Sequence, residues 1–178
     1  MNISIPLEKI YEKMHELEKI LDYKFNDINN LANAMCAVNL GNKKNKPDYY
    51  ASALATVGDA VIKTILADEL FKAGFDKGII TIEKSEIEKT SYFLENIVNP
   101  LGIFNYGFNE KWFYPEVVNV KNLQHEKVAH PDHDFYYEAI VGAIYYDGGF
   151  CVCKKWLLDH HFGKKIEDIK KKYQTTTD

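Results

Sequence analysis

The chain has 178 residues, which suits one domain with a substantial core and is too short for two ordinary ones. Apolar residues make up 46% and charged residues 27%, as in soluble globular proteins, and no apolar run is long enough to cross a membrane. The net charge of −4 does not favour nucleic-acid binding, although a local basic face would still permit it. Three cysteines without a C-x-x-C pair indicate neither a disulfide framework nor a zinc site. Residues 1–20 lack a signal-peptide core, so we expect a cytoplasmic protein without membrane contact.

The sequence predicts an almost wholly helical chain. Apolar residues at helical spacing, or apolar runs between turn signals, mark the expected helices: 7–21, 27–38, 49–73, 81–98 and 135–147. Asp27 can cap the second helix, Gly74 closes the third, and Asn99-Pro100 is expected to end the fourth. Strand signals are poor throughout, and the polar stretch 41–47 is a connection. The expected fold class is therefore all-α.

Residues 104–133 are rich in aromatic side chains but have no clear periodicity. A loop of this length in a compact domain is usually functional or covered by a partner. Its aromatic rings could stack on bases, but packing on the domain or in a subunit interface is the simpler interpretation. His130 and His133 resemble a metal cluster, yet they lack a third and a fourth ligand, so zinc is not expected.

Two carboxylates stand inside otherwise apolar helices. Asp59 lies in A-L-A-T-V-G-D-A-V-I-K (53–63), and Glu138 lies in F-Y-Y-E-A-I-V-G-A (135–143). A buried ionised carboxylate is costly unless a cation, a metal or hydrogen-bond donors compensate it. If the two helices meet, the two carboxylates suit a hard cation such as Mg²⁺. The alternative is that Asp59 pairs with Lys63, one helical turn later, and Glu138 with some other base.

Four sequence blocks, in order, resemble the ribonuclease III family. The stretch V-G-D-A-V-I-K-T-I-L at 57–66 is similar to that family's signature helix, usually written E-x-L-E-F-L-G-D-A-V-L. The stretch E-A-I-V-G-A-I-Y-Y-D-G-G at 138–149 resembles the family's E-A-L-I-G-A-I-Y-L-D-G-G. Residues 21–35 and 75–85 resemble two further blocks. The resemblance implies the all-α fold of the ribonuclease III endonuclease domain.

The resemblance also implies an organisation and a function. We expect a ribonuclease III-like domain over 1–165, a lysine-rich C-terminal tail over 166–178 and no double-stranded-RNA-binding domain. The implied function is metal-dependent cleavage of double-stranded RNA, in RNA processing, by a homodimer. Asp59 and Glu138 would be the catalytic residues and the ligands of Mg²⁺, for which Mn²⁺ could substitute. The natural RNA substrate does not follow from the resemblance.

Full-length family members carry four metal-site carboxylates, of which two are replaced here, by Ala55 and Phe135. Two other positions that are acidic in the family carry Ser52 and Lys77. The compact mini-ribonuclease III branch has the same alanine and lacks the same aspartate of the second helix, so the motif is closest to that branch. This likeness keeps catalysis by Asp59 and Glu138 plausible. The alternative is a catalytically degenerate domain that serves as an RNA-binding or structural subunit.

Further candidates lie around these two helices. Asp134 precedes Glu138 by one turn, so it can serve as an additional metal ligand or as the N-cap of its helix. Three lysines, in what is otherwise a solvated loop, are candidates for binding RNA phosphates: Lys43, Lys44 and Lys46. Four apolar side chains near the acidic site are candidates for the dimer contact: Tyr49, Tyr50, Leu54 and Val57.

Overall fold

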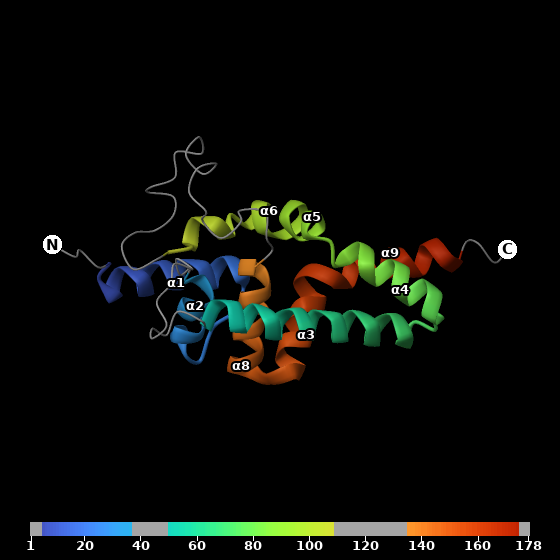
Figure 1. The fold of residues 1–178 in the computed structure, drawn as a ribbon, viewed down its shortest axis with the longest axis horizontal. Helices are drawn as coiled ribbons and strands as arrows, with labels where there is room; N and C mark the ends of the chain where they lie inside the picture. The colour runs from blue at the N-terminus through green and yellow to red at the C-terminus, as the bar shows by residue number, and fades with distance from the viewer. Residues whose placement is uncertain (1–4, 37–49, 109–134, 175–178) are drawn as a thin grey trace.

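The structure, a computed structural model, describes residues 5–36, 50–108 and 135–174 (Figure 1). Its α-helices are α1 (Leu7–Leu21), α2 (Ile28–Met35), α3 (Tyr50–Lys72), α4 (Lys77–Ile87), α5 (Thr90–Phe93), α6 (Asn99–Leu101), α8 (Phe135–Leu157) and α9 (Gly163–Gln174). Two π-helical turns, η1 (Leu94–Val98) and η3 (Leu158–Phe162), and a 3₁₀ turn, η2 (Ile103–Tyr106), join them. Within the described residues, β structure is limited to an isolated bridge between Cys36 and Phe108. The expected all-α fold is confirmed, and no helix of the described part is long and apolar enough to span a membrane.

The centre of the fold is the crossing of α3 and α8, which form the most extensive helix pair of the described chain (Figure 1). Glycines let the two backbones touch there. A Cβ atom on Gly58 of α3 would lie 1.8 Å from the backbone oxygen of Glu138, and one on Gly142 of α8 would lie 2.1 Å from that of Leu54. Any side chain at either glycine would force the helices apart. The motif glycines therefore set the separation of the helices that carry Asp59 and Glu138.

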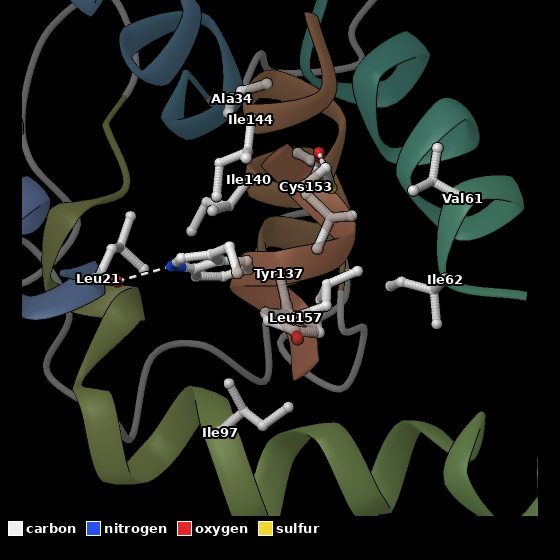
Figure 2. Close-up of a cluster of buried hydrophobic side chains, with 14 of the residues drawn as sticks. Leu21, Ala34, Val61, Ile62, Ile97, Tyr137, Ile140, Ile144, Cys153 and Leu157 are labelled. Atoms are coloured by element: carbon white, nitrogen blue, oxygen red, sulfur yellow. Dashed lines mark hydrogen bonds between the residues drawn. The ribbon is translucent and has the colours of Figure 1, made fainter. Parts of the chain in front are cut away.

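The other elements enclose this pair in one hydrophobic core. Its fully buried aromatic side chains include Tyr137, Phe93 and Phe162, and each large apolar side chain buried in this way contributes roughly 1.5–3 kcal/mol. The indole Nε1 of Trp156 donates a hydrogen bond of 2.8 Å to the backbone oxygen of Leu21, which ties α8 to the end of α1. Figure 2 shows this bond as a dashed line within the buried cluster.

The carboxylate of Asp147 anchors α8 to the connection between α1 and α2. It accepts hydrogen bonds from the backbone N–H groups of Asn26 at 2.9 Å and Asp27 at 3.0 Å, and from the Tyr23 hydroxyl at 3.0 Å. Partial burial alone would raise the pKa of Asp147, but these bonds and one from Asn30 hold it below its ordinary value. The aspartate of the D-G-G sequence is thus structural.

Several helix boundaries agree with the sequence prediction. α1 has the expected bounds, and Asp27 caps α2 as expected, because its side chain accepts from the backbone N–H of Asn29 at 3.0 Å. α2 ends at Met35, earlier than predicted, where Cys36 turns to extended backbone and bridges Phe108. α3 ends one residue before the expected position, and Gly74 follows with φ of 86°.

The helix expected over 81–98 is divided, so this prediction is wrong. α4 begins earlier, because the Asp76 side chain accepts from the backbone N–H of Ile79 at 2.9 Å and caps it. The chain then becomes extended at Lys89, with φ of −64° and ψ of 133°, before α5 begins. Pro100 does not stop the helical path, because it occupies the first turn of α6, where proline is tolerated.

α8 continues past its expected end at 147. It bends at Gly149, which has φ of 79°, and resumes so that Cys153 and Trp156 reach the core. Of the aromatic stretch 104–133, the described part packs on the domain: the Phe104 ring meets Tyr136 edge-on at 5.8 Å, and Phe108 is buried. The remainder of that stretch lies outside the described residues.

The C-terminal helix α9 packs against the fold beside α4 (Figure 1). Ile166 and Ile169 are buried, and the buried Glu83 of α4 accepts hydrogen bonds from the Tyr173 hydroxyl at 2.8 Å and from Lys172 Nζ at 2.5 Å. The boundary expected at residue 165 falls inside this helix. The division into domain and tail stays a prediction.

Candidate active site at the crossing of α3 and α8

Asp59 follows Gly58 on α3, so it stands at the point where the two helix backbones touch. The motif places apolar neighbours on either side of it, of which Val61 and Ile62 are buried. The Asp59 side chain itself retains 38% exposure. Its carboxylate is therefore open to solvent. The apolar neighbours are buried as the sequence suggested, but the Asp59 charge itself is not.

Lys63 is the direct partner of Asp59. Its Nζ donates a hydrogen bond of 2.7 Å to Asp59 Oδ2, one helical turn away on the same face. This hydrogen bond raises the pKa of Lys63, and the charges of Asp59, Glu88 and Glu138 raise it further. The pairing that the sequence offered as the alternative to a metal site is thus present, and the Lys63 ammonium lies in the field of carboxylates from α3, α4 and α8.

Glu138 lies in the first turn of α8, where it is half-buried. Its backbone oxygen is the atom that a side chain at Gly58 would strike, so Glu138 and Asp59 belong to the same helix crossing. The charge of Glu138, like that of Asp59, raises the pKa of Lys63. The expectation that Asp59 and Glu138 share one ion or one bridging water stays a prediction.

Glu88 is a charged neighbour that the sequence did not single out. It is the C-cap residue of α4, and its two carboxylate oxygens accept hydrogen bonds from Lys84 Nζ at 2.9 Å and 3.0 Å. Glu88 contributes to the field at Lys63 because α4 packs alongside α3. No local sequence signal reports such a tertiary approach.

The described side chains at positions where the family has acidic residues add no carboxylate to the site. Ala55 is buried at 5% exposure, one turn before Asp59. Lys77 is exposed in the first turn of α4, and its positively charged side chain cannot serve as a metal ligand. The side chains of Ser52 and Phe135 are outside the described part of the structure.

Other predicted residues are placed less completely. Asp134 and the three lysines proposed for RNA, Lys43, Lys44 and Lys46, lie outside the described residues. The same holds for Tyr49 and for both histidines of the 130–134 segment. Leu54 is buried against α8, so the suggestion that it contacts a second chain is wrong, whereas Val57 is half-buried and remains available.

The donor set can be compared with what a divalent ion requires. Within the described residues, no group of three or more histidine, cysteine, aspartate or glutamate side chains could hold a metal ion. A cage made by protein alone is therefore not formed there. Mg²⁺, however, is commonly bound through one or two carboxylates, retained waters and substrate phosphates. Asp59 and Glu138 fit that second kind of site, because they supply hard oxygen donors and Asp59 is accessible from solvent.

Comparison with known proteins gives a consistent result. No family model matches the chain. A curated relative named Ribonuclease 3, from Wolbachia pipientis subsp. Culex pipiens, is 27% identical over 159 residues, which are 86% of this chain and 64% of the relative. A second Ribonuclease 3, from Flavobacterium psychrophilum, is 30% identical over 146 residues, 80% of this chain and 54% of that relative. The chain thus spans less than two thirds of the length of either relative.

Two solved structures of the nuclease domain of ribonuclease III from Campylobacter jejuni have a similar fold. One has a TM-score of 0.61 with 27% identity and covers 81% of this chain and 92% of its own. The other has a TM-score of 0.62 with 26% identity and covers 84% of this chain and 94% of its own. With the all-α fold and the glycine-mediated crossing of the two motif helices, these similarities support the identification of the chain as an endonuclease domain of the ribonuclease III type.

Proposed function

We propose that the chain is a divalent-metal-dependent endoribonuclease that cleaves double-stranded RNA and acts in RNA processing. The observation that carries this proposal is the contact of Gly58 with the Glu138 backbone. It brings to one helix crossing the two carboxylate-bearing positions that match the family's motifs. Asp59 and Glu138 are accordingly the proposed catalytic residues and metal ligands.

Each residue has a distinct part in this proposal. The accessible carboxylate of Asp59 holds the ion directly, and Glu138 completes its ligands or orients the attacking water. Mg²⁺, or Mn²⁺ in its place, supplies an activated water and stabilises the charge that develops on the scissile phosphate. The RNA phosphate would provide further oxygen ligands, as substrate phosphates commonly do for Mg²⁺. Asp134, four residues before Glu138 in the sequence, is proposed as an additional ligand.

The proposed substrate and assembly follow from the same family. A-form duplex RNA is recognised by its shape, through backbone phosphates and 2′-hydroxyl groups, and the proposed contacts from Lys43, Lys44 and Lys46 are of that kind. In one of the Campylobacter jejuni nuclease-domain structures, a region involved in dimer formation is structurally flexible. A homodimer of the present chain would use a self-complementary surface beside the site, to which the half-buried Val57 can contribute.

A second candidate function is a catalytically degenerate subunit that binds RNA or stabilises a larger assembly. Two observations favour it: Ala55 is buried where full-length members carry an acid, and Lys63 already neutralises Asp59. In that case the crossing would keep the fold but would not bind an ion strongly enough for chemistry.

Incubation of the purified chain with a long RNA duplex, in millimolar Mg²⁺ or Mn²⁺, separates the two functions. The enzyme proposal predicts cleavage that a chelator stops and that Asp59→Asn abolishes. Asp68→Asn on the same helix is the matched control, because Asp68 pairs with Lys72 and Lys154 away from the crossing and should leave cleavage intact. Binding of the duplex without any cleavage in either ion would favour the degenerate subunit.

A further inference from the structure

Lys63 occupies a place at the site that the proposed function does not use. Its Nζ lies 2.7 Å from Asp59 Oδ2, an oxygen that a bound ion would also need. The Lys63 side chain is 47% exposed, so it is held by this contact and not by surrounding packing. A flexible side chain of this kind can leave Asp59 without disturbing the core.

A second lysine on α3, Lys72, forms an ion pair with the same four-residue spacing as the Lys63–Asp59 pair, so Lys63 differs from it only in its surroundings. Lys72 pairs with Asp68 over the same spacing and at the same distance of 2.7 Å. That pair lies nine residues further along α3, about 14 Å along the helix axis. Asp68 is also bound by Lys154 at 2.6 Å, so the Lys72 pair belongs to a surface network at the other end of the helix.

Lys63 stands among carboxylates that come from three parts of the fold. Asp59 and Glu138 stand at the crossing, and Glu88 approaches from α4 with its own partner Lys84. Lys63 pairs directly with Asp59, and the charge of Glu138 adds to the rise of the Lys63 pKa. A divalent ion that enters must either displace this ammonium or share Asp59 with a like charge, which is unfavourable.

We propose that the Lys63 ammonium is an internal counter-cation of the site, which competes with the divalent ion for Asp59 and lowers the affinity of the free protein for that ion. This inference rests on the proposed function. When the ion binds, the ammonium turns away toward another anion, and the phosphate of a bound RNA is the one that the proposed reaction provides. Metal loading is thereby linked to the presence of RNA.

The test compares Mn²⁺ binding by wild type and Lys63→Gln without RNA, followed by electron paramagnetic resonance of the free ion. Removal of one positive charge beside a doubly charged ion should tighten Mn²⁺ binding roughly 5- to 20-fold, given the partial screening of an exposed site. Lys72→Gln removes the same charge from the same helix and should change the affinity less than twofold. Lys63→Arg keeps the charge and should bind like wild type.

The variants distinguish failure of this inference from failure of the proposed function. The tighter binding in Lys63→Gln must disappear in the double variant Lys63→Gln/Asp59→Asn, which locates the ion at Asp59. If Asp59→Asn loses Mn²⁺ while Lys63→Gln binds it no better than wild type, the counter-cation role is refuted and the metal site stands. If Mn²⁺ binding never depends on Asp59, the metal site fails, and the role of Lys63 fails with it.

Discussion

Gly58→Ala tests the contact on which the whole site depends. The added Cβ would lie 1.8 Å from the backbone oxygen of Glu138 and 2.9 Å from the backbone nitrogen of Gly142. Neither atom can rotate away, because both belong to the α8 backbone, so the helices must separate. Alanine in place of glycine gains about 1 kcal/mol of helix propensity. Overpacking in a tight core costs typically about 1–3 kcal/mol and sometimes more, and a backbone clash lies at the upper end.

We therefore expect Gly58→Ala to lower the free energy of unfolding by about 2–3 kcal/mol, the net of these two effects. For a domain of this size the midpoint of thermal unfolding should fall by about 5–10 °C, measured by far-ultraviolet circular dichroism. Cleavage of duplex RNA should fall further than stability predicts, because Glu138 moves away from Asp59. The matched control is Gly78→Ala in α4, where the nearest atom is the Asp76 side-chain oxygen at 3.2 Å. A Gly58→Ala protein as stable and as active as wild type would refute the proposed crossing.

Three further predictions concern the site, the core and the anchor of α8. Asp59→Asn should leave the melting curve nearly unchanged, because the side chain is 38% exposed, but should abolish metal-dependent cleavage; retained cleavage would exclude Asp59 as a ligand. Burial, together with the charge of His160, lowers the pKa of His161 to about 4. Between about pH 6.5 and 4, His161 is therefore protonated in the unfolded chain but neutral in the folded one. The free energy of unfolding should decline as pH falls through this range, by at most about 3 kcal/mol. Urea unfolding across this range should show that decline in wild type and a smaller one in His161→Phe, and equal slopes would contradict the assignment. Asp147→Ala leaves two backbone N–H groups without their acceptor and should cost about 2 kcal/mol in urea unfolding, whereas Asp159→Ala, which removes an exposed pair with Lys155, should cost less than about 0.5 kcal/mol.

The sequence predicted helices well where a local signal marks their ends. Asp27 caps α2 through its own side chain, and Gly74 follows α3 with the positive φ that glycine permits. The division after α4 was not predictable in this way, because helical periodicity continues through Lys89 without a glycine or a proline. Beyond the break, Phe93 and Ile97 are buried in the core, and such tertiary packing leaves no local mark in the sequence.

At α8 the sequence predicted a helix end at residue 147 that the structure does not have. Adjacent glycines at 148 and 149 favour a helix end, but the helix resumes after Gly149. Burial of Cys153, Trp156 and Leu157 stabilises the continuation, and their apolar spacing becomes informative only once the core is known.

In the candidate site, too, local sequence signals predict some features, whereas tertiary packing determines others. Asp59 and Glu138 were found from their motifs, and the Lys63 partner follows from the spacing of one helical turn. The field of Glu88 at Lys63 could not be predicted, because it arises where the end of α4 approaches α3. The half-exposure of Asp59 was likewise missed, since its neighbours in sequence are apolar while its own face of the helix is open.

Anomalous diffraction from crystals of the protein soaked in Mn²⁺, with and without a short RNA duplex, would show whether Asp59 and Glu138 together bind the ion that the proposed cleavage requires. We expect a Mn²⁺ peak coordinated by the Asp59 carboxylate and within direct or water-mediated reach of Glu138. The peak should be stronger when RNA is present, with Lys63 turned away from Asp59. A fully occupied Mn²⁺ site elsewhere, with the Lys63–Asp59 pair intact in an actively cleaving protein, would contradict this expectation.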